Sequence, residues 1–138
     1  MPLYNTYELH AEWEPSERLK RKIEPFLAEN GLTYDALAEY SAVVTDRDGA
    51  MCATGSLRGN VLKCIAVQEA CRGEDLMATV VTDLMQAALA RGRRSLLVYT
   101  KPQNRPLFEG MGFHAIASTA DAALLESPRG GMADYFRR

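Results

Sequence analysis

Hydrophobic positions recur with a helical period just after the midpoint of the chain. In residues 76–90, apolar side chains return at four-residue steps, at Leu76, Val80, Leu84 and Ala88. Val81 and Met85 lie beside this row, so the segment has one apolar stripe of an amphipathic helix. We predict that the helix ends at Gly92, because glycine commonly follows the last helical turn.

A second helical pattern lies nearer the start and is bounded by capping residues. Ser16 is suited to cap a helix whose apolar positions are Leu19, Ile23, Phe26 and Leu27 and which runs towards Asn30 and Gly31. We expect Pro25 to kink this helix or to end its regular part early. A short helical turn is predicted around residues 34–37, and the residues before Pro15 predict no element.

Short apolar runs predict the strands. Three of them, at 40–45, 50–57 and 61–67, are separated by turn residues, which is the pattern of a three-stranded meander. Residues 95–100 (SLLVYT) are apolar on both faces, as expected for an interior strand. Asn104 is suited to cap a short helix through Leu107 and Phe108, and residues 113–118 and 122–125 predict two closing strands.

The junction between strand 61–67 and helix 76–90 carries the strongest functional signal. After the loop 68–71, the sequence Arg72-Gly73-Glu74-Asp75-Leu76-Met77 opens the helix. The first turn of a helix has unpaired backbone N–H groups, and these form a cradle for phosphate oxygens. The junction therefore predicts a phosphate site.

Composition narrows the class of protein. A length of 138 residues predicts one domain, and a net charge of -2 gives no basic excess suited to nucleic acid. The first ten residues lack the pattern of a signal peptide, and no apolar run is long enough to span a membrane, so we expect a cytoplasmic protein without nucleic-acid or membrane partners. The three cysteines have neither zinc-site nor disulfide-framework spacing, and we predict no metal.

The order of elements resembles a known family. A meander, a glycine turn with a long helix, a buried strand and the motif Asn-x-x-Leu-Phe-x-x-x-Gly-Phe at 104–113 are similar to the GNAT acyltransferases. The resemblance implies an α/β fold with a mixed, mostly antiparallel central sheet of six to seven strands and helices on both faces. Residues 1–127 would form one acyl-CoA- or pantetheine-binding domain, and residues 128–138 would be a tail or truncated linker.

Two stretches, 55–67 and 100–108, are also similar to the N-terminal GNAT-like domain of the citrate lyase ligase family. The resemblance implies that the ATP chemistry of such a ligase belongs to a second domain with a His-x-x-His type signature. The histidines of this chain are His10 and His114, which do not form that signature. The chain would then correspond to the N-terminal module.

The resemblance also implies a ligand, acetyl-CoA or a related CoA or pantetheine derivative. The backbone of Ile65, Ala66 and Val67 would pair with the pantetheine arm where this strand diverges from strand 95–100. The diphosphate would be held by the backbone amides of the turn, which comprises Arg72, Gly73, Glu74, Asp75, Leu76 and Met77. Asn104 would either bond the amides of the arm or act only as a helix cap, and Phe108 falls where a tyrosine is often found.

Asp75 and Met77 occupy positions that are small in the family. Unit charges of like sign repel by about 4 kcal/mol at 4 Å when the effective dielectric constant is near 20. A carboxylate in the first helical turn stabilises the helix by about 0.3 to 1 kcal/mol. Repulsion therefore outweighs capping if Asp75 faces a diphosphate. The alternative is that Glu74 and Asp75 simply cap a helix that binds CoA poorly.

Acyl transfer needs a base for the acceptor and an acid for the leaving thiolate. Phe108 cannot donate a proton, so Tyr99 is the candidate acid, with interior packing as its alternative role. Glu69 and Glu39 are the candidate bases, and solvated surface positions are the alternative for both. Cys64 is discounted as a nucleophile because its neighbour Lys63 should point to the opposite face of the strand.

Two functions follow from the sequence. The first is a GNAT-fold domain that binds acyl-CoA or a phosphopantetheine thioester and transfers an acetyl group by direct attack. The second is a non-catalytic docking module that receives the CoA-derived prosthetic arm or the acyl carrier subunit of citrate lyase.

Overall fold

The structure is a computed structural model, and it describes residues 7–73, 75–131 and 133. Glu74 therefore lies outside the described residues. The elements in chain order are β1 (Glu8–Trp13), α1 (Glu17–Glu29), β2 (Tyr40–Thr45), β3 (Met51–Arg58), β4 (Val61–Val67), the 3-10 turn η1 (Glu69–Cys71), α2 (Leu76–Ala90), β5 (Leu96–Thr100), the 3-10 turn η2 (Pro102–Asn104), α3 (Arg105–Gly110), β6 (His114–Ser118) and β7 (Ala123–Ser127).

The described strands form one seven-stranded sheet in the order β1-β2-β3-β4-β5-β7-β6. Neighbouring strands are antiparallel except β4 and β5, which are parallel. The sheet is thus mixed and mostly antiparallel, which confirms the predicted fold class. The meander β2-β3-β4, the interior strand β5 and the two closing strands all lie within a few residues of their predicted bounds.

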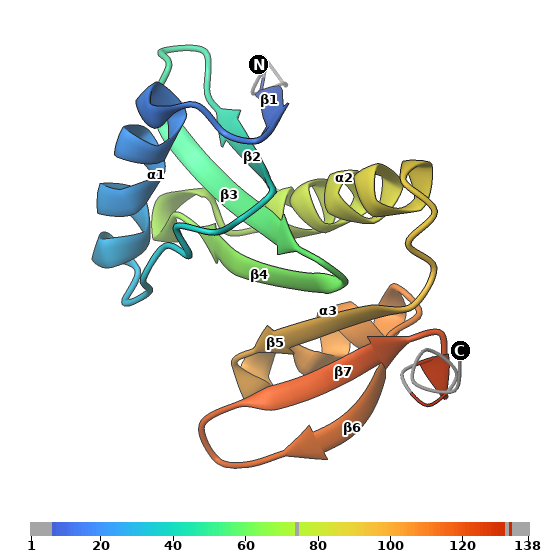
Figure 1. Cartoon of the computed structure of the whole chain (residues 1–138). Coiled ribbons are helices and arrows are strands. Elements are labelled where there is room, and N and C mark those ends of the chain that lie inside the picture. Colours follow the sequence, from blue (N-terminus) through green and yellow to red (C-terminus); the bar gives the residue numbers. More distant parts are fainter. Residues whose placement is uncertain (1–6, 74, 132, 134–138) are drawn as a thin grey trace.

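Helices cover both faces of the sheet, and each face has its own hydrophobic core (Figure 1). One core joins the apolar stripe of α2 to the inner face of the strands and to Phe108 and Phe113. The other joins α1, through Leu19, Ile23, Phe26 and Leu27, to Val43 and Ala66. The stripe predicted for 76–90 is confirmed, because its residues Leu76, Val80, Val81, Leu84 and Ala88 are buried.

Three local expectations for the N-terminal half were wrong. Residues 8–13, which predicted no element, form the edge strand β1, paired with β2 along its whole length. Helix α1 continues past Pro25 to Glu29, so the early end considered for it is wrong, because Pro25 lies on the exposed face, where water can reach the carbonyl group that its missing N–H leaves unpaired. Residues 34–37 form no helix, and only a turn is found at residues 36–37.

The middle of β4 carries a bulge. Thr54 pairs with Ala66 and Ser56 with Lys63, so Gly55 alone faces the two residues Cys64 and Ile65. Cys64 adopts a left-handed backbone conformation, with φ of 54°. A bulge of this kind bends a strand and re-aims its side chains.

Strands β4 and β5 pair only over Val61 with Leu97 and Leu62 with Val98, and then they separate. Beyond Leu62, the β5-facing edge of β4 has no strand partner in the described sheet. This divergence was predicted from the family resemblance, and it opens the sheet at its centre.

The described residues after β7 pack against the sheet. The Gly131 N–H donates a hydrogen bond of 2.8 Å to the Pro128 carbonyl, and the Gly130 N–H donates one of 2.9 Å to Glu126 Oε1. Gly131 is buried beside Ser95. The segment that begins at residue 128 therefore starts with ordered contacts.

Candidate functional site

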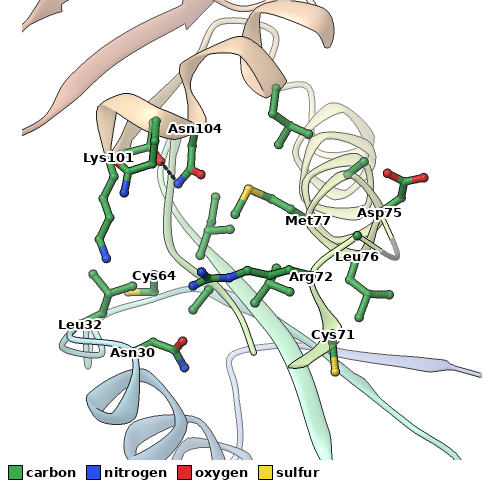
Figure 2. Close-up of a pocket in the computed structure, with 18 of the residues that line it drawn as sticks. Asn30, Leu32, Cys64, Cys71, Arg72, Asp75, Leu76, Met77, Lys101 and Asn104 are labelled. Carbon is green, nitrogen blue, oxygen red and sulfur yellow. Dashed lines mark hydrogen bonds between the residues drawn. The ribbon is translucent and has the colours of Figure 1, made fainter. Parts of the chain in front are cut away.

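A cavity of about 350 Å³ lies where β4 and β5 diverge. Its walls come from β4, the loop before α2, the first turn of α2, the end of β5 and the segment leading into α3 (Figure 2). The lining residues are Asn30, Leu32, Cys64, Ile65, Ala66, Val67, Cys71, Arg72, Gly73, Asp75, Leu76, Met77, Ala78, Tyr99, Thr100, Lys101, Gln103, Asn104 and Leu107. The size lies within the range of small-molecule sites.

Most of the residues predicted to bind a cofactor meet in this cavity. Ile65, Ala66 and Val67 form the strand wall, and the described turn residues and Asn104 lie around it. Tyr99, the candidate acid, also lines it. The structure thus brings together segments that lie up to about forty residues apart in sequence.

The start of α2 has a geometry that the sequence did not indicate. Asp75 is the N-cap residue in a left-handed conformation, with φ of 57°, and its side chain makes no capping hydrogen bond. Its carboxylate is exposed and points away from Met77 and Asn104 (Figure 2). Asp75 therefore holds the N-cap position that one alternative gave it, but its side chain makes no capping bond, and the part of that alternative that concerns Glu74 lies outside the described residues.

Met77 is the residue that narrows this end of the cavity. Its thioether projects from α2 towards the middle of the cavity (Figure 2), and part of its side chain packs against the main core. Met77 is thus a bulky side chain beside the first turn of α2, at the end of the cavity where the turn was predicted to hold a diphosphate.

Asn104 does not use its side chain as a helix cap. Its Nδ2 donates a hydrogen bond of 3.1 Å to Thr100 Oγ1, and the first turn of α3 has no side-chain cap. The side-chain capping role considered for Asn104 was wrong. The amide oxygen remains directed to the cavity region rather than to the helix (Figure 2).

Tyr99 and Phe108 have opposite environments. Tyr99 is 64% exposed at the end of β5, so it does not fill the interior as the alternative for this strand residue assumed. Phe108 is fully buried and meets Phe113 edge to face, with ring centroids 5.6 Å apart. Phe108 therefore lies behind the cavity in the core and not among its lining residues.

The two candidate bases lie elsewhere. Glu69 is exposed on η1. Glu39 directly precedes β2, and its carboxylate accepts a hydrogen bond from the N–H of Gly59 in the β3–β4 turn and pairs with Arg93 at 3.1 Å. The bond from Gly59 and the pair with Arg93 lower the pKa of Glu39. Neither carboxylate lines the cavity, and a lowered pKa makes Glu39 a weaker base.

Cys64 lines the cavity but is poorly suited to act as a nucleophile. Burial raises the pKa of its thiol, which disfavours the reactive thiolate. Lys63 is engaged by Asp35, with Nζ 2.8 Å from Oδ2. The conclusion against this thiol therefore rests on burial and not on the predicted alternation of faces, because the bulge interrupts that alternation and the charge of Lys63 acts to lower the pKa of the thiol.

Several lining residues were not singled out from the sequence. Lys101 and Gln103 lie inside the Thr-Lys-Pro-Gln-Asn stretch at 100–104 that carried the family resemblance, so that motif held a usable signal. Asn30 and Leu32 come from the end of α1 and the loop after it, where no pattern marks a site. Only the fold brings them to β4.

The described residues offer neither a metal site nor a membrane-spanning helix. Across 7–73, 75–131 and 133, no three His, Cys, Asp or Glu side chains gather in a group that could hold a metal ion. Within the same ranges, no helix is long and apolar enough to cross a membrane.

Comparisons with known proteins agree on the fold. The chain is 36% identical over 120 residues to "[Citrate [pro-3S]-lyase] ligase" of Klebsiella pneumoniae, a match that covers 86% of this chain and 35% of that protein. The chain thus spans about a third of the length of this relative. No protein-family profile matches the chain.

Solved structures extend the comparison. An acetyltransferase of the GNAT family from Staphylococcus aureus Mu50 has a TM-score of 0.68 at 10% identity, over 86% of this chain and 98% of that chain. An acyl-CoA N-acyltransferase from Pseudomonas aeruginosa has a TM-score of 0.69 at 14% identity, over 88% and 99%. At such identities the likeness shows the fold, and it confirms the resemblance that the sequence motifs indicated.

Proposed function

We propose that this chain, which has the GNAT fold and is homologous to a part of citrate lyase ligase, binds a pantetheine-type thioester between β4 and β5. We propose further that this ligand is acetyl-CoA or the CoA-derived arm of an acyl carrier subunit. The observation that carries it is the divergence of β4 from β5 after Leu62.

The backbone of β4 supports this ligand class. From Lys63 to Val67 the strand has no partner on its β5 side, and Ile65, Ala66 and Val67 line the cavity there. An extended chain with amide groups, such as pantetheine, can pair with such an edge as an added strand. This mode of binding uses main-chain groups, so it tolerates the unusual residues at the start of α2.

The cavity also has a candidate acid for acyl transfer. A bound thioester supplies an acyl carbon that an acceptor nucleophile attacks, after which the carbon–sulfur bond breaks and a thiolate leaves. The Tyr99 hydroxyl lies on the cavity wall and is open to water, so it is suited to give the thiolate a proton and to regain one from solvent. Glu69 and Glu39 have no role in this proposal, and water accepts the proton of the acceptor.

The competing function is binding without turnover, as in a docking module. Phe108 lies in the core with no hydroxyl group, and Met77 narrows the phosphate end. Because of these two features, the chain has fewer of the groups that a catalytic GNAT site would use. Turnover, and not binding, therefore distinguishes the two functions.

Calorimetric titration of the chain with pantetheine, dephospho-CoA and acetyl-CoA tests the proposal. We expect pantetheine to bind. Dephospho-CoA and acetyl-CoA should bind no more than about tenfold more tightly than pantetheine, because the start of α2 should add little affinity for their phosphate groups. Release of free thiol from acetyl-CoA with a panel of acceptors then separates transfer from docking. If pantetheine at saturating concentration gives no heat and no thermal shift, the proposal is wrong.

A further inference from the structure

The cavity has two ends with different surroundings. One end is formed by the loop before α2 and the first turn of that helix, with Gly73, Leu76 and Met77. The other end is formed by Asn30 and Leu32, which follow α1, together with Cys64 of the β4 bulge. The diverging strand edge lies between the two ends, so a ligand along β4 leaves the second end for another molecule.

Two cations reach towards this second end. Arg72 extends from the loop before α2 across the cavity, and Lys101 extends from the end of β5, and both charged groups point towards Leu32 and Cys64 (Figure 2). Within the described part of the chain, neither side chain has an ion pair or a hydrogen bond to a side chain. Their charges are therefore available to a ligand.

Among the described residues, Asp35 and Asp75 form no ion pair with either cation. Asp35, on the loop after Leu32, is bound by Lys63 at 2.8 Å and by Arg58 at 3.2 Å. Asp75, the acidic residue of the described lining, turns its carboxylate away (Figure 2). The charged groups of the described lining are thus the two cations and one carboxylate that turns away, although the whole chain has a net charge of -2. Such a cavity attracts anions and repels cationic acceptors.

We infer that the acyl acceptor bound at the Asn30–Leu32 end is an anion, a small molecule whose carboxylate or phosphate group pairs with Arg72 and Lys101. The inference rests on the proposed function, because it assigns the acceptor of the same cavity. It excludes polyamines and lysine side chains as preferred acceptors. The acceptor's own nucleophile, an amine or a thiol, then faces the thioester along β4.

A matched pair of probes tests this charge preference without requiring turnover. N-acetylglycine carries a carboxylate, and N-acetylglycinamide has nearly the same shape without the charge. Each is titrated into the full chain, first alone and then with saturating CoA, while the methyl resonances of Leu32 are followed by NMR. We expect N-acetylglycine to shift these resonances with a Kd about fivefold or more below that of the amide.

Charge variants locate the effect. Lys101→Gln and Arg72→Gln should each reduce the preference for N-acetylglycine, and the double variant should abolish it. Arg47→Gln is the matched control, because Arg47 is exposed in the turn between β2 and β3 and does not line the cavity. It should leave the preference unchanged.

The outcomes separate this inference from the proposed function. Equal affinity for the two probes, or no shift at Leu32 with either, overturns the anionic acceptor. If CoA binds and abolishes the response to N-acetylglycine, the cations serve the phosphates of CoA, which overturns the inference and leaves the proposed function intact. If CoA and pantetheine do not bind but N-acetylglycine still does, the proposed function fails while the anion subsite remains.

Discussion

Gly55 lies directly against Val80: a Cβ atom placed on Gly55 would be 2.5 Å from Val80 Cγ1 and 2.9 Å from a Leu84 methyl group. Both partners are fully buried on α2, and Gly55 also faces the bulge of β4. Gly55→Ala should therefore lower the free energy of unfolding by about 1 to 3 kcal/mol, as overpacked cores do. Chemical denaturation measures this loss.

Gly110→Ala is the matched control for Gly55. Its added methyl group meets no atom within 4 Å, and its backbone has no positive φ. This variant should change stability by no more than about 0.5 kcal/mol. Equal stability of the two variants would contradict the close contact between β3 and α2.

Met77→Ala should strengthen binding of diphosphate-containing ligands. Removing the thioether opens the start of α2, so dephospho-CoA should gain severalfold in affinity while pantetheine gains little. Met85→Ala is the control, because Met85 is also partly buried against the main core but does not line the cavity. Calorimetry on both variants measures the difference, and an unchanged ratio of the two affinities would remove Met77 as the obstacle.

Asp75→Asn should have only a small effect on the same ligands. The carboxylate points away from the cavity, and a unit charge about 10 Å away in a watery environment contributes only about 0.4 kcal/mol. Asparagine also tolerates the left-handed backbone at this position. We expect a change in dephospho-CoA affinity of about twofold, and a gain of tenfold would mean that the charge does face the ligand.

Tyr99→Phe should reduce acyl transfer and spare binding. A positioned general acid contributes about two to four orders of magnitude in rate, and the Tyr99 hydroxyl has no recorded hydrogen-bond partner among the described residues. Its exposure means that stability should change by no more than about 0.5 kcal/mol. Single-turnover thiol release at saturating acetyl-CoA gives the measurement, and a full rate in the variant would assign the acid elsewhere.

Asp35 makes stability depend on acid pH. The hydrogen bond from Lys63 is the main cause that lowers the pKa of Asp35 to about 2, from an ordinary value of 3.8. Because the folded pKa is the lower one, Asp35 stabilises the fold above about pH 4, and this contribution is lost as the pH falls through about 2. Asp35→Asn should cost about 1 kcal/mol or less at pH 7, and this cost should shrink as the pH falls from about 4 to 2 and vanish below that.

Denaturation curves at several pH values check the Asp35 prediction. Asp48→Asn, in the exposed turn between β2 and β3, serves as the control and should show no such convergence with the wild type. A cost of Asp35→Asn that stays constant down to pH 2 would show that the residue acts through packing rather than through its charge.

The sequence predicted those elements whose local pattern and tertiary setting agree. The apolar stripe of helix 76–90 and the apolar run of strand 61–67 are clear in the sequence. The structure has both elements at the predicted bounds. Strand β1 was missed because its alternation is weak: Leu9, His10 and Glu12 belong to an edge strand open to solvent. The Pro25 prediction failed because the effect of proline depends on which face of the helix it occupies.

The site was harder to predict than the fold. The motif at 72–77 predicted a segment that does line the cavity, but the direction of the Asp75 carboxylate depends on its left-handed backbone, which the sequence did not predict. The bulge at Cys64 lies opposite Gly55 of the neighbouring strand. The sequence around Cys64 alone therefore does not predict it. Asn30 and Leu32 reach the cavity through tertiary folding alone, which is why a search along the chain did not find them.

The two residue pairs that join β4 to β5 are the shortest pairing in the described sheet. Little else in the sheet ties β1-β4 to β5-β7-β6 besides those pairs, the Leu97 N–H bond to the Asn60 carbonyl and the Asn60 side-chain bond to Ser95. A ligand that pairs like a strand would extend the connection between the two halves of the sheet along the rest of β4. Under the proposed function, occupancy of the cavity would therefore increase the force needed to separate the two halves of the sheet.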